Sequence, residues 1–382
     1  MTVLTHIICA LAVLYGATIL LFIVGLMRRP AGKNATLHQV SVVIAARNEQ
    51  ENIGHLLNDL IKQDYPPELF DVTIVDDNSV DDTASIVSEF AQKQANIKLL
   101  SVENIPNTFS PKKYALQQAV QQASGKIILT TDADCRLPET WIRSMVRYFA
   151  DEVGFVIGFS QLGSQSQKQN LIEKLQAFDF IQLMGAAAGT ANLGFPLASS
   201  GQNMAYRRDA FLRVNGYQRV AHRVSGDDVL LLQLVRRFTN YKIVFASDPS
   251  AFVTSKPEPT LWSFINQRKR WASNGSYQLI LNPLFFVYLL QVFLYNAGLL
   301  VGIPLALVTG HHLPLLLVCL FIRAGLEIGI GIKSTHYFRR QDLLTYFPVW
   351  FVLQIPYIVF VGAMGTFGRF NWKERSHSAD VG

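Results

Sequence analysis

Acidic side chains follow three apolar runs of this sequence, where they could bind a metal ion or the hydroxyl groups of a ligand. The runs are residues 40–45, 72–75 and 126–130, and the acids after them are Glu49, Asp76, Asp77, Asp132 and Asp134. Carboxylates that lie close together raise one another's pKa. Bringing these acids together would therefore be unfavourable without a cation or a hydrogen-bonding ligand. If the three runs are neighbouring strands of one sheet, the acids at their ends would indicate a binding site.

The clearest of these signals is the Asp-x-Asp sequence formed by Asp132 and Asp134. Alternate residues of an extended chain point to the same side, so both carboxylates could reach one hard cation. Magnesium typically takes one or two carboxylates together with substrate phosphates and water. The structural alternative is a solvated turn, or a helix cap before Pro138.

The other charged candidates also have structural alternatives. Asp76 and Asp77 could bind a ligand or could serve as turn and cap residues, because Asp favours both positions. Asp227 and Asp228 open an apolar run, so they either cap a helix or supply a general base. Lys112 begins a predicted helix, where a cation opposes the helix dipole; it is either solvated or paired with an anion.

The segments that carry these residues alternate between strand and helix patterns. The predicted strands are residues 40–45, 72–75, 97–102 and 126–130, and the predicted helices are residues 52–63, 81–92 and 112–123. Such alternation predicts an α/β fold with a mostly parallel sheet, in which ligands bind beyond the carboxyl ends of the strands. No Gly-x-Gly-x-x-Gly follows any of the strands, which disfavours a dinucleotide-binding dehydrogenase.

Four apolar segments outside this region are long enough to cross a membrane. Half of the 382 residues are hydrophobic and only 16% are charged, a low fraction for a wholly soluble protein. The segments are residues 7–27, 282–310, 313–332 and 343–367, each about as long as a spanning helix. Arg323 and Glu327 interrupt the third segment. They predict either a mutually neutralising pair on one helix face or a polar path for a glycan or lipid headgroup.

This layout predicts a membrane-anchored protein of four parts. The parts are an N-terminal transmembrane anchor at residues 1–29, a globular domain at 30–281, about three C-terminal membrane helices at 282–368 and a tail at 369–382. The first apolar segment lacks a basic start and is too long for a signal peptide. Arg28 and Arg29 follow it, and by the positive-inside rule they predict that the globular domain lies on the cytoplasmic side. The membrane is predicted to be a bacterial-type inner membrane or a plasma membrane. Four full crossings would leave the basic tail outside, so the number of spans stays open.

Cysteine and charge usage exclude several other classes. Cys9, Cys135 and Cys319 are widely spaced with no Cys-x-x-Cys pattern, so neither a zinc cluster nor a disulfide framework is predicted. The net charge is +6, but no basic run with interleaved aromatics occurs in the globular part, which disfavours nucleic acid. Anionic lipid headgroups and a diphosphate substrate suit this charge better.

Seven motifs occur along the chain in a recognisable order. They are VSVVIAARNE (40–49), VDDNSVDDT (75–83), PKKYAL (111–116), TTDADC (130–135), SGQNMAYRR (200–208), SGDDVLL (225–231) and QRKRW (267–271). Together they resemble the processive-type branch of glycosyltransferase family 2, the inverting GT-A enzymes, over residues 40–271. The resemblance implies a Rossmann-like GT-A domain that binds a nucleotide-diphospho-sugar and is flanked by N- and C-terminal transmembrane helices.

The resemblance also implies how the donor is held. Ala45, Arg47, Glu49 and Asp77 match positions that contact the nucleotide-sugar, with Glu49 and Asp77 at the base and the ribose. Lys112 matches the lysine that approaches the nucleotide phosphates. UDP is the usual nucleotide of the family, and no residue here excludes GDP.

For the chemistry, the resemblance implies a divalent metal and a carboxylate base. Asp132 and Asp134 match the residues that hold Mg²⁺ or Mn²⁺ against the diphosphate, and Asp228 matches the catalytic base. Asp227 stands where glutamate is more usual, so the roles could be divided differently between Asp227 and Asp228. Pro111 replaces the glycine that commonly precedes the lysine, which alters the loop there.

The remaining implied positions concern the acceptor. Gln267, Arg270 and Trp271 match the Gln-x-x-Arg-Trp motif that closes over the diphosphate and the acceptor, and Gly201 and Asn203 match acceptor contacts. Taken alone, basic and aromatic residues beside a membrane segment would be interfacial anchors. The apolar segment 178–196 is either core or an interfacial surface for a lipid acceptor.

These residues predict an inverting glycosyltransferase of the cell envelope. Its acceptor is predicted to be a lipid or lipid-linked molecule, because few membrane spans leave little room for a polymer channel. The Gln-x-x-Arg-Trp motif favours the alternative, a subunit of a polysaccharide synthase. A nucleotidyltransferase is disfavoured by that motif, and an inactive nucleotide-sugar-binding scaffold is disfavoured by the intact carboxylates.

Overall fold

The computed structural model describes residues 2–102, 104–163, 169–372 and 375–378. Within this part of the chain, the contacts divide into two compact units. The sheet unit consists of residues 29–163 and 194–257, and the helical unit consists of residues 2–28, 169–193 and 258–378. The second segment of the helical unit therefore interrupts the sheet unit along the sequence.

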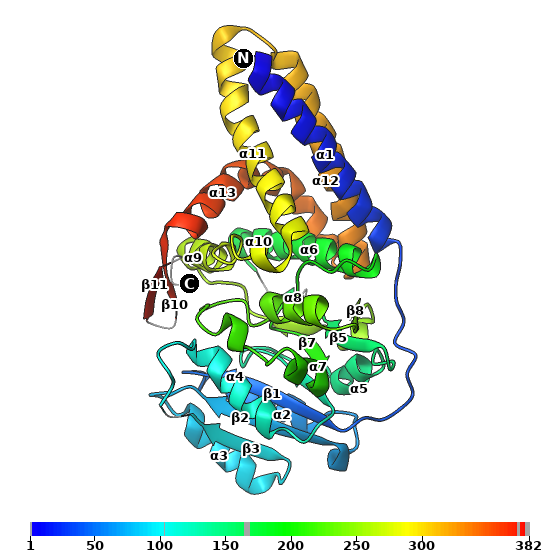
Figure 1. The fold of residues 1–382 in the computed structure, drawn as a ribbon, viewed down its shortest axis with the longest axis vertical. Helices are drawn as coiled ribbons and strands as arrows, with labels where there is room; N and C mark the ends of the chain where they lie inside the picture. Colours follow the sequence, from blue (N-terminus) through cyan, green and yellow to red (C-terminus); the bar gives the residue numbers. More distant parts are fainter. Residues whose placement is uncertain (1, 103, 164–168, 373–374, 379–382) are drawn as a thin grey trace. The chain divides into compact units, whose positions relative to one another are not determined.

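A mixed seven-stranded sheet forms the core of the sheet unit (Figure 1). In spatial order its strands are β3 (Ile97–Ser101), β2 (Phe70–Asp76), β1 (Val40–Ala46), β4 (Ile127–Thr130), β7 (Met204–Arg207), β5 (Val153–Ile157) and β8 (Lys242–Phe245). β1 to β4 are parallel to one another, β7 is antiparallel to both β4 and β5, and β8 is parallel to β5. The predicted α/β class is confirmed, and each of the four predicted strands lies in this sheet.

Helices of the sheet unit bury their apolar faces against the sheet. They are α2 (Ile53–Ile61), α3 (Thr83–Lys93), α4 (Pro111–Gln122), α5 (Trp141–Val146), α7 (Arg208–Arg213) and α8 (Val229–Phe238). In α2, Leu56, Leu57 and Leu60 recur at helical spacing and are fully buried in the core that covers the sheet. A small second sheet pairs β6 (Ser160–Leu162) with β9 (Val253–Ser255), and short 3-10 helices lie at Pro67–Leu69, Gln218–Val220 and Pro249–Ala251.

The register of the parallel strands brings their carboxyl ends to one edge of the sheet. Ala46, the last residue of β1, pairs with Asp76, the last residue of β2. Asn48 and Asn78 follow these ends and both have φ of 53°, a left-handed conformation that Asn tolerates better than most residues. The chain therefore turns sharply after each strand, and polar loops gather at this edge.

The helical unit contains long apolar helices and shorter ones that cross them (Figure 1). The long ones are α1 (Thr2–Leu26), α11 (Pro283–Thr309), α12 (Leu313–Tyr337) and α13 (Phe347–Phe367). By length and composition, four segments could cross a membrane: Thr2–Leu26, Pro283–Thr309, Leu313–Tyr337 and Gln341–Thr366. The remaining elements are α6 (Leu171–Asn192), α9 (Leu261–Ala272), α10 (Gln278–Leu281), a 3-10 helix (Gln341–Tyr346) and the hairpin strands β10 (Arg369–Trp372) and β11 (Arg375–Ser378).

A buried polar cluster joins the long helices. Arg323 Nε donates to Glu327 Oε1 at 2.9 Å, so the expected pair on one helix face is present. The same guanidinium donates to Asn296 Oδ1 of α11 at 2.8 Å and to Gln354 of α13, and Tyr15 of α1 donates to Glu327. Both charged side chains are at most 2% exposed. The two charges neutralise each other within α12, and uncharged side chains of three other helices form hydrogen bonds with them.

Candidate functional site

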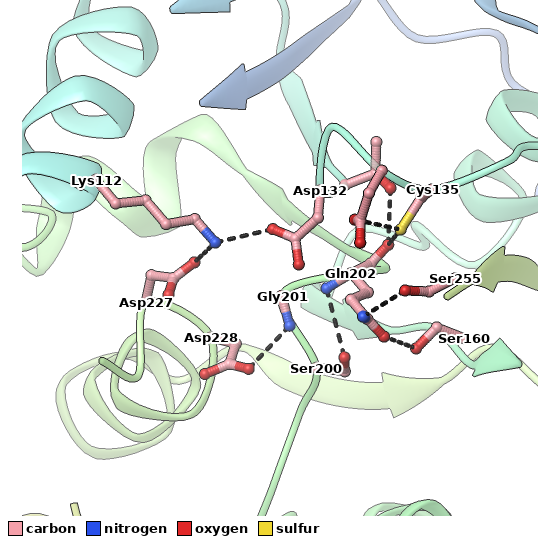
Figure 2. A network of polar contacts seen from close by, with 12 residues as sticks. Lys112, Asp132, Cys135, Ser160, Ser200, Gly201, Gln202, Asp227, Asp228 and Ser255 are labelled. Atoms are coloured by element: carbon pink, nitrogen blue, oxygen red, sulfur yellow. Dashed lines mark hydrogen bonds and ion pairs between the residues drawn. The ribbon is translucent and has the colours of Figure 1, made fainter. Parts of the chain in front are cut away.

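Lys112 lies at the centre of a charged cluster beyond the carboxyl ends of the strands (Figure 2). Its Nζ is 2.8 Å from Asp132 Oδ1 and 3.0 Å from Asp227 Oδ2. The three side chains keep 20%, 31% and 12% of their surface exposed, so a ligand can still reach them. Burial alone would lower the pKa of Lys112, but the two carboxylates outweigh burial and raise it. Of the two alternatives for this lysine, solvated or paired with an anion, the structure shows the pairing, with two carboxylates.

The Asp-x-Asp segment is a turn rather than extended chain, so that part of the prediction is wrong. β4 ends at Thr130, and Cys135 N donates to Asp132 O at 3.2 Å, which closes a turn. Burial, followed by the charges of Asp132 and Glu49, raises the pKa of Asp134 to about 6. Mutual repulsion of buried carboxylates is the condition that a bound cation relieves. The turn therefore keeps Asp134 close to Asp132 without the alternating geometry of a strand.

Asp228 is held by two backbone N–H groups. Its Oδ1 accepts from its neighbour Val229 N at 2.6 Å at the start of α8, and its Oδ2 accepts from Gly201 N at 2.8 Å (Figure 2). Burial, followed by the charge of Asp227, raises the pKa of Asp228 to about 6. Each carboxylate oxygen keeps a second lone pair, so capping and proton acceptance are compatible in one side chain.

Asp227 has the opposite electrostatic environment. Burial alone would raise its pKa, but the ammonium groups of Lys112 and Lys113 outweigh burial and lower it. Gly226 precedes it with φ of +82°, a backbone conformation that favours glycine. The two adjacent acids therefore differ in electrostatic environment: the pKa of Asp227 is lowered beside Lys112, and that of Asp228 is raised to about 6.

The loops after β1 and β2 are joined by hydrogen bonds. Arg47 donates to the backbone oxygen of Asp77 at 3.0 Å, and Glu49 N donates to Thr83 Oγ1 at 2.8 Å. Asp76 accepts from Ser79 N at 3.3 Å, which is the turn role considered for it. Asp77 is 5% exposed, and Ala45 is half-buried within β1. The structure thus gathers these predicted nucleotide contacts at the end of β1 and in the two neighbouring loops.

Residues 201 and 203 make structural contacts next to the site. Gly201 carries the N–H that holds Asp228, and a Cβ at residue 201 would lie only 3.2 Å from Asp227 Oδ2. Asn203 is fully buried, donates to Phe159 O and Ala251 O at 2.8 Å each, and accepts from the indole of Trp141. Because these bonds engage both ends of its carboxamide, we assign Asn203 a structural role rather than the predicted acceptor contact.

Gln202 is a site residue that the sequence did not single out. Its side chain accepts from Ser160 Oγ at 2.6 Å and donates to Ser255 Oγ at 2.8 Å, and its backbone oxygen accepts from Thr131 Oγ1 at 2.8 Å (Figure 2). These bonds fasten the small β6–β9 sheet to the turn that carries Asp132. A glutamine between motif residues has no local signature, since both partners of its side chain are distant in sequence.

Gln267, Arg270 and Trp271 lie on α9 and belong to the helical unit. Gln267 donates to Glu258 Oε1 at 2.8 Å. The guanidinium of Arg268, in the same motif, lies 4.1 Å from the centroid of the Trp271 ring. The motif is therefore fixed within the helical unit by one amide–carboxylate bond and one cation–π contact.

A further link fixes α9 against α6. Arg268 is ion-paired with Asp179 of α6 at 2.9 Å, and both side chains are less than one-tenth exposed. Asp179 Oδ1 also accepts from Trp350 Nε1 of α13 at 3.2 Å. The single charged residue of the apolar segment 178–196 therefore neutralises a buried arginine of the Gln-x-x-Arg-Trp motif.

The site offers few protein ligands for a metal ion. Among the residues that the structure describes, no group of three or more His, Cys, Asp or Glu side chains is arranged to hold an ion. Asp132 and Asp134 fit a cation that draws its other ligands from phosphate and water, which is how Mg²⁺ is usually bound. The raised pKa of Asp134 reflects its burial and the charges of Asp132 and Glu49, which a bound cation would offset.

Comparison with known sequences agrees with this geometry. Residues 41–213 match the model of Glycosyl transferase family 2. The Probable glycosyltransferase YdaM of Bacillus subtilis (strain 168) is 29% identical over 252 residues, covering 64% of this chain and 57% of the relative. The Beta-monoglucosyldiacylglycerol synthase of Synechocystis sp. (strain ATCC 27184 / PCC 6803 / Kazusa) is 29% identical over 243 residues, covering 62% and 48%. The chain spans about half the length of these curated relatives.

Comparison with solved structures extends the likeness over most of the chain. The mannosyltransferase PcManGT from Pyrobaculum calidifontis, solved with GDP-Man and Mn²⁺, has a TM-score of 0.60 at 18% identity. The match covers 92% of this chain and 99% of that one. The mixed sheet with carboxylates at its strand ends is therefore a GT-A fold. Residues 41–213 form a glycosyltransferase family 2 domain within it.

Proposed function

We propose that this protein is an inverting glycosyltransferase that transfers a sugar from a nucleotide-diphosphate-sugar to a lipid or lipid-linked acceptor at a membrane. One observation carries the proposal. Lys112, Asp132 and the Asp227–Asp228 pair gather at the carboxyl edge of a GT-A sheet, where they can receive a diphosphate and activate a hydroxyl. The family 2 domain supports the reaction class.

The donor is proposed to lie across the loops after β1, β2 and β4. Arg47, Glu49 and Asp77 lie in the first two loops and Ala45 near the end of β1, where they would contact the nucleoside, with UDP favoured over GDP. Lys112 would leave the two carboxylates that it now joins and pair with the diphosphate, because an ammonium group binds phosphate well as a point charge.

A divalent ion, Mg²⁺ or Mn²⁺, is proposed to accompany the donor. Asp132 and Asp134 would hold it, and it would neutralise the charge that develops on the leaving diphosphate. The fit rests on two neighbouring carboxylates, one of which has its pKa raised to about 6 by burial and by its acidic neighbours.

The transfer itself requires a base on the acceptor side. Asp228 would take the proton of the acceptor hydroxyl as its oxygen attacks the anomeric carbon from the face opposite the diphosphate, which inverts the configuration. Gly201 N and Val229 N hold the carboxylate in one orientation. General bases of this kind contribute roughly 10²–10⁴-fold to the rate.

The acceptor and the membrane are proposed from the helical unit. Four of its segments have the length and composition of spanning helices, and α9 exposes Leu261 and Trp262 by 54% and 71%. An apolar and aromatic surface on a helix that crosses the long helices suits the headgroup region of a bilayer. Gln267, Arg270 and Trp271 on this helix would contact the diphosphate and the acceptor. A lipid substrate would then reach them without leaving the membrane.

The arrangement of the chain is proposed accordingly. An N-terminal transmembrane anchor (residues 1–29) precedes a cytoplasmic GT-A region (30–281), which C-terminal membrane helices (282–368) and a tail (369–382) follow. Arg28 and Arg29 after the first helix favour the cytoplasmic side for the catalytic region. One relative is named a monoglucosyldiacylglycerol synthase, and another, a Staphylococcus epidermidis protein, is named a Poly-beta-1,6-N-acetyl-D-glucosamine synthase. A lipid acceptor is favoured over a growing polymer.

The test is release of nucleoside diphosphate by the purified protein in detergent, with a panel of UDP- and GDP-sugars and native lipid extract. Turnover of one donor that requires Mg²⁺ or Mn²⁺ and is lost in Asp132→Ala and Asp228→Asn is expected. Asp151→Asn, at an exposed aspartate, is the matched control and should retain activity. If donor binds but no donor is turned over with any lipid fraction, the protein is an inactive nucleotide-sugar-binding scaffold instead.

A further inference from the structure

Two adjacent lysines at the start of α4 have different environments. Lys112 faces the carboxylates of Asp132 and Asp227. Lys113 is fully buried, and its Nζ donates to the backbone oxygens of Arg223 and Ser225, the latter at 2.7 Å. Its position in the sequence, next to Lys112, gives no indication of this role. The side chain is instead directed into the loop that precedes the Asp227–Asp228 pair.

The loop that Lys113 contacts has little regular structure of its own. Residues 223–228 form most of the connection between the 3-10 helix Gln218–Val220 and α8, and Gly226 within them has φ of +82°. A buried backbone oxygen needs a donor, and Lys113 serves two such oxygens at alternate residues. The contacts lie four and two residues before Asp227. The Lys113 side chain therefore fixes the backbone of the residues that lead into Asp227 and Asp228.

Burying this ammonium group is electrostatically unfavourable unless anions compensate it. Burial lowers the pKa of Lys113 to about 7, although Asp227 and Asp228 oppose the shift; Arg223 and Lys112 lower it further. Two carbonyl oxygens and two carboxylates are thus arranged around one buried cation. Buried charges are generally retained only where they are paired and hydrogen-bonded.

We propose that Lys113 is a positioning residue for the transfer reaction, which holds the 223–228 loop so that Asp228 faces the acceptor. The inference rests on the proposed function, because it assigns Asp228 as the base. Lys112 acts on the donor phosphates, whereas Lys113 acts on the base from inside the protein. The two lysines therefore affect different kinetic constants.

The test compares Lys113→Met with Lys113→Gln and with Lys126→Met, a control at an exposed lysine. In Lys113→Met, kcat should fall roughly 10²-fold, as for other small misplacements of a catalytic group. The KM for the nucleotide-sugar should change little. The acid limb of the kcat–pH profile should move to higher pH, because a positive charge near Asp228 is lost. Lys113→Gln retains an N–H donor and should recover part of kcat while keeping the shifted limb.

A second readout does not depend on turnover. Amide hydrogen exchange in residues 223–228 should quicken in Lys113→Met and stay unchanged in Lys126→Met. If the wild-type protein turns over no donor, the proposed function fails, while faster exchange in this loop would still support its anchoring by Lys113. Unchanged exchange in a folded Lys113→Met variant would overturn the positioning role. So would a normal kcat, or a loss confined to KM.

Discussion

The titration of Asp228 gives the sharpest prediction for the reaction. Burial and the neighbouring Asp227 raise its pKa from 3.8 to about 6. A base must be deprotonated to act, so activity is present above this pKa and is lost as the pH falls through it. One pH unit below the pKa only about a tenth of the molecules carry the ionised base, so kcat at about pH 5 should be roughly a tenth of its plateau value.

The assay is release of nucleoside diphosphate between about pH 4.5 and 8, at saturating donor and metal. These conditions separate Asp228 from Asp134, whose pKa is also raised to about 6. A bound cation lowers the pKa of its carboxylate ligands, so Asp134 should affect the metal concentration required rather than kcat. A metal titration at each pH measures that contribution independently.

Asp228→Asn should lower kcat by roughly 10²–10⁴-fold and remove the acid limb from the residual activity. The amide retains an oxygen that can accept from Gly201 N or Val229 N, so the fold should be preserved. A wild-type kcat that is flat down to about pH 5, or a variant that keeps the same limb, would refute the assignment of Asp228 as the base.

Three further predictions test other parts of the structure. Lys112→Met should weaken donor binding yet tighten binding of free Mn²⁺ by about tenfold in calorimetry, because Asp132 loses its internal counter-ion; weaker Mn²⁺ binding would contradict this. Asp179→Asn should lower the free energy of unfolding by about 3–5 kcal/mol, since it leaves Arg268 buried without its anion; a loss under about 1 kcal/mol would be typical of an exposed pair and would count against it. Mild oxidation should join Cys9 to Cys319, whose sulfur atoms lie 3.7 Å apart, and peptide mass spectrometry would detect the bond; its absence would contradict the packing of α1 on α12.

The sequence predicts the parts of the fold that depend on local pattern. The buried runs that became β1 and β4 are continuous and β-branched, and a parallel sheet necessarily aligns their carboxyl ends. Of the charged candidates, Asp132 follows β4 closely, and Lys112 joins it to Asp227. The four apolar segments likewise coincide with the four helices of spanning length.

What the sequence could not predict depends on distant contacts. Segment 178–196 is apolar all round, so its periodicity does not identify the unit to which α6 belongs; packing against α1 and α12 decides it. Asp134 was expected on extended chain, but the hydrogen bond from Cys135 N to Asp132 O closes a turn instead. Lys113 and Gln202 act through partners about 40 to 110 residues away, which no local spacing encodes.

The buried cluster around Arg323 has a consequence for biosynthesis. Tyr15 and its partner Glu327 are separated by 312 residues, so at about 5–20 residues per second the ribosome needs about 15 to 60 seconds to supply the second after the first. If the helices insert into a bilayer, α1 can enter it before α12 has been synthesised, because the group that α1 contributes to the cluster is an uncharged phenol. The arginine and glutamate of α12 lie one helical turn apart, so neither charge needs another helix for neutralisation. The neutral partners on α1, α11 and α13 can then assemble in any order.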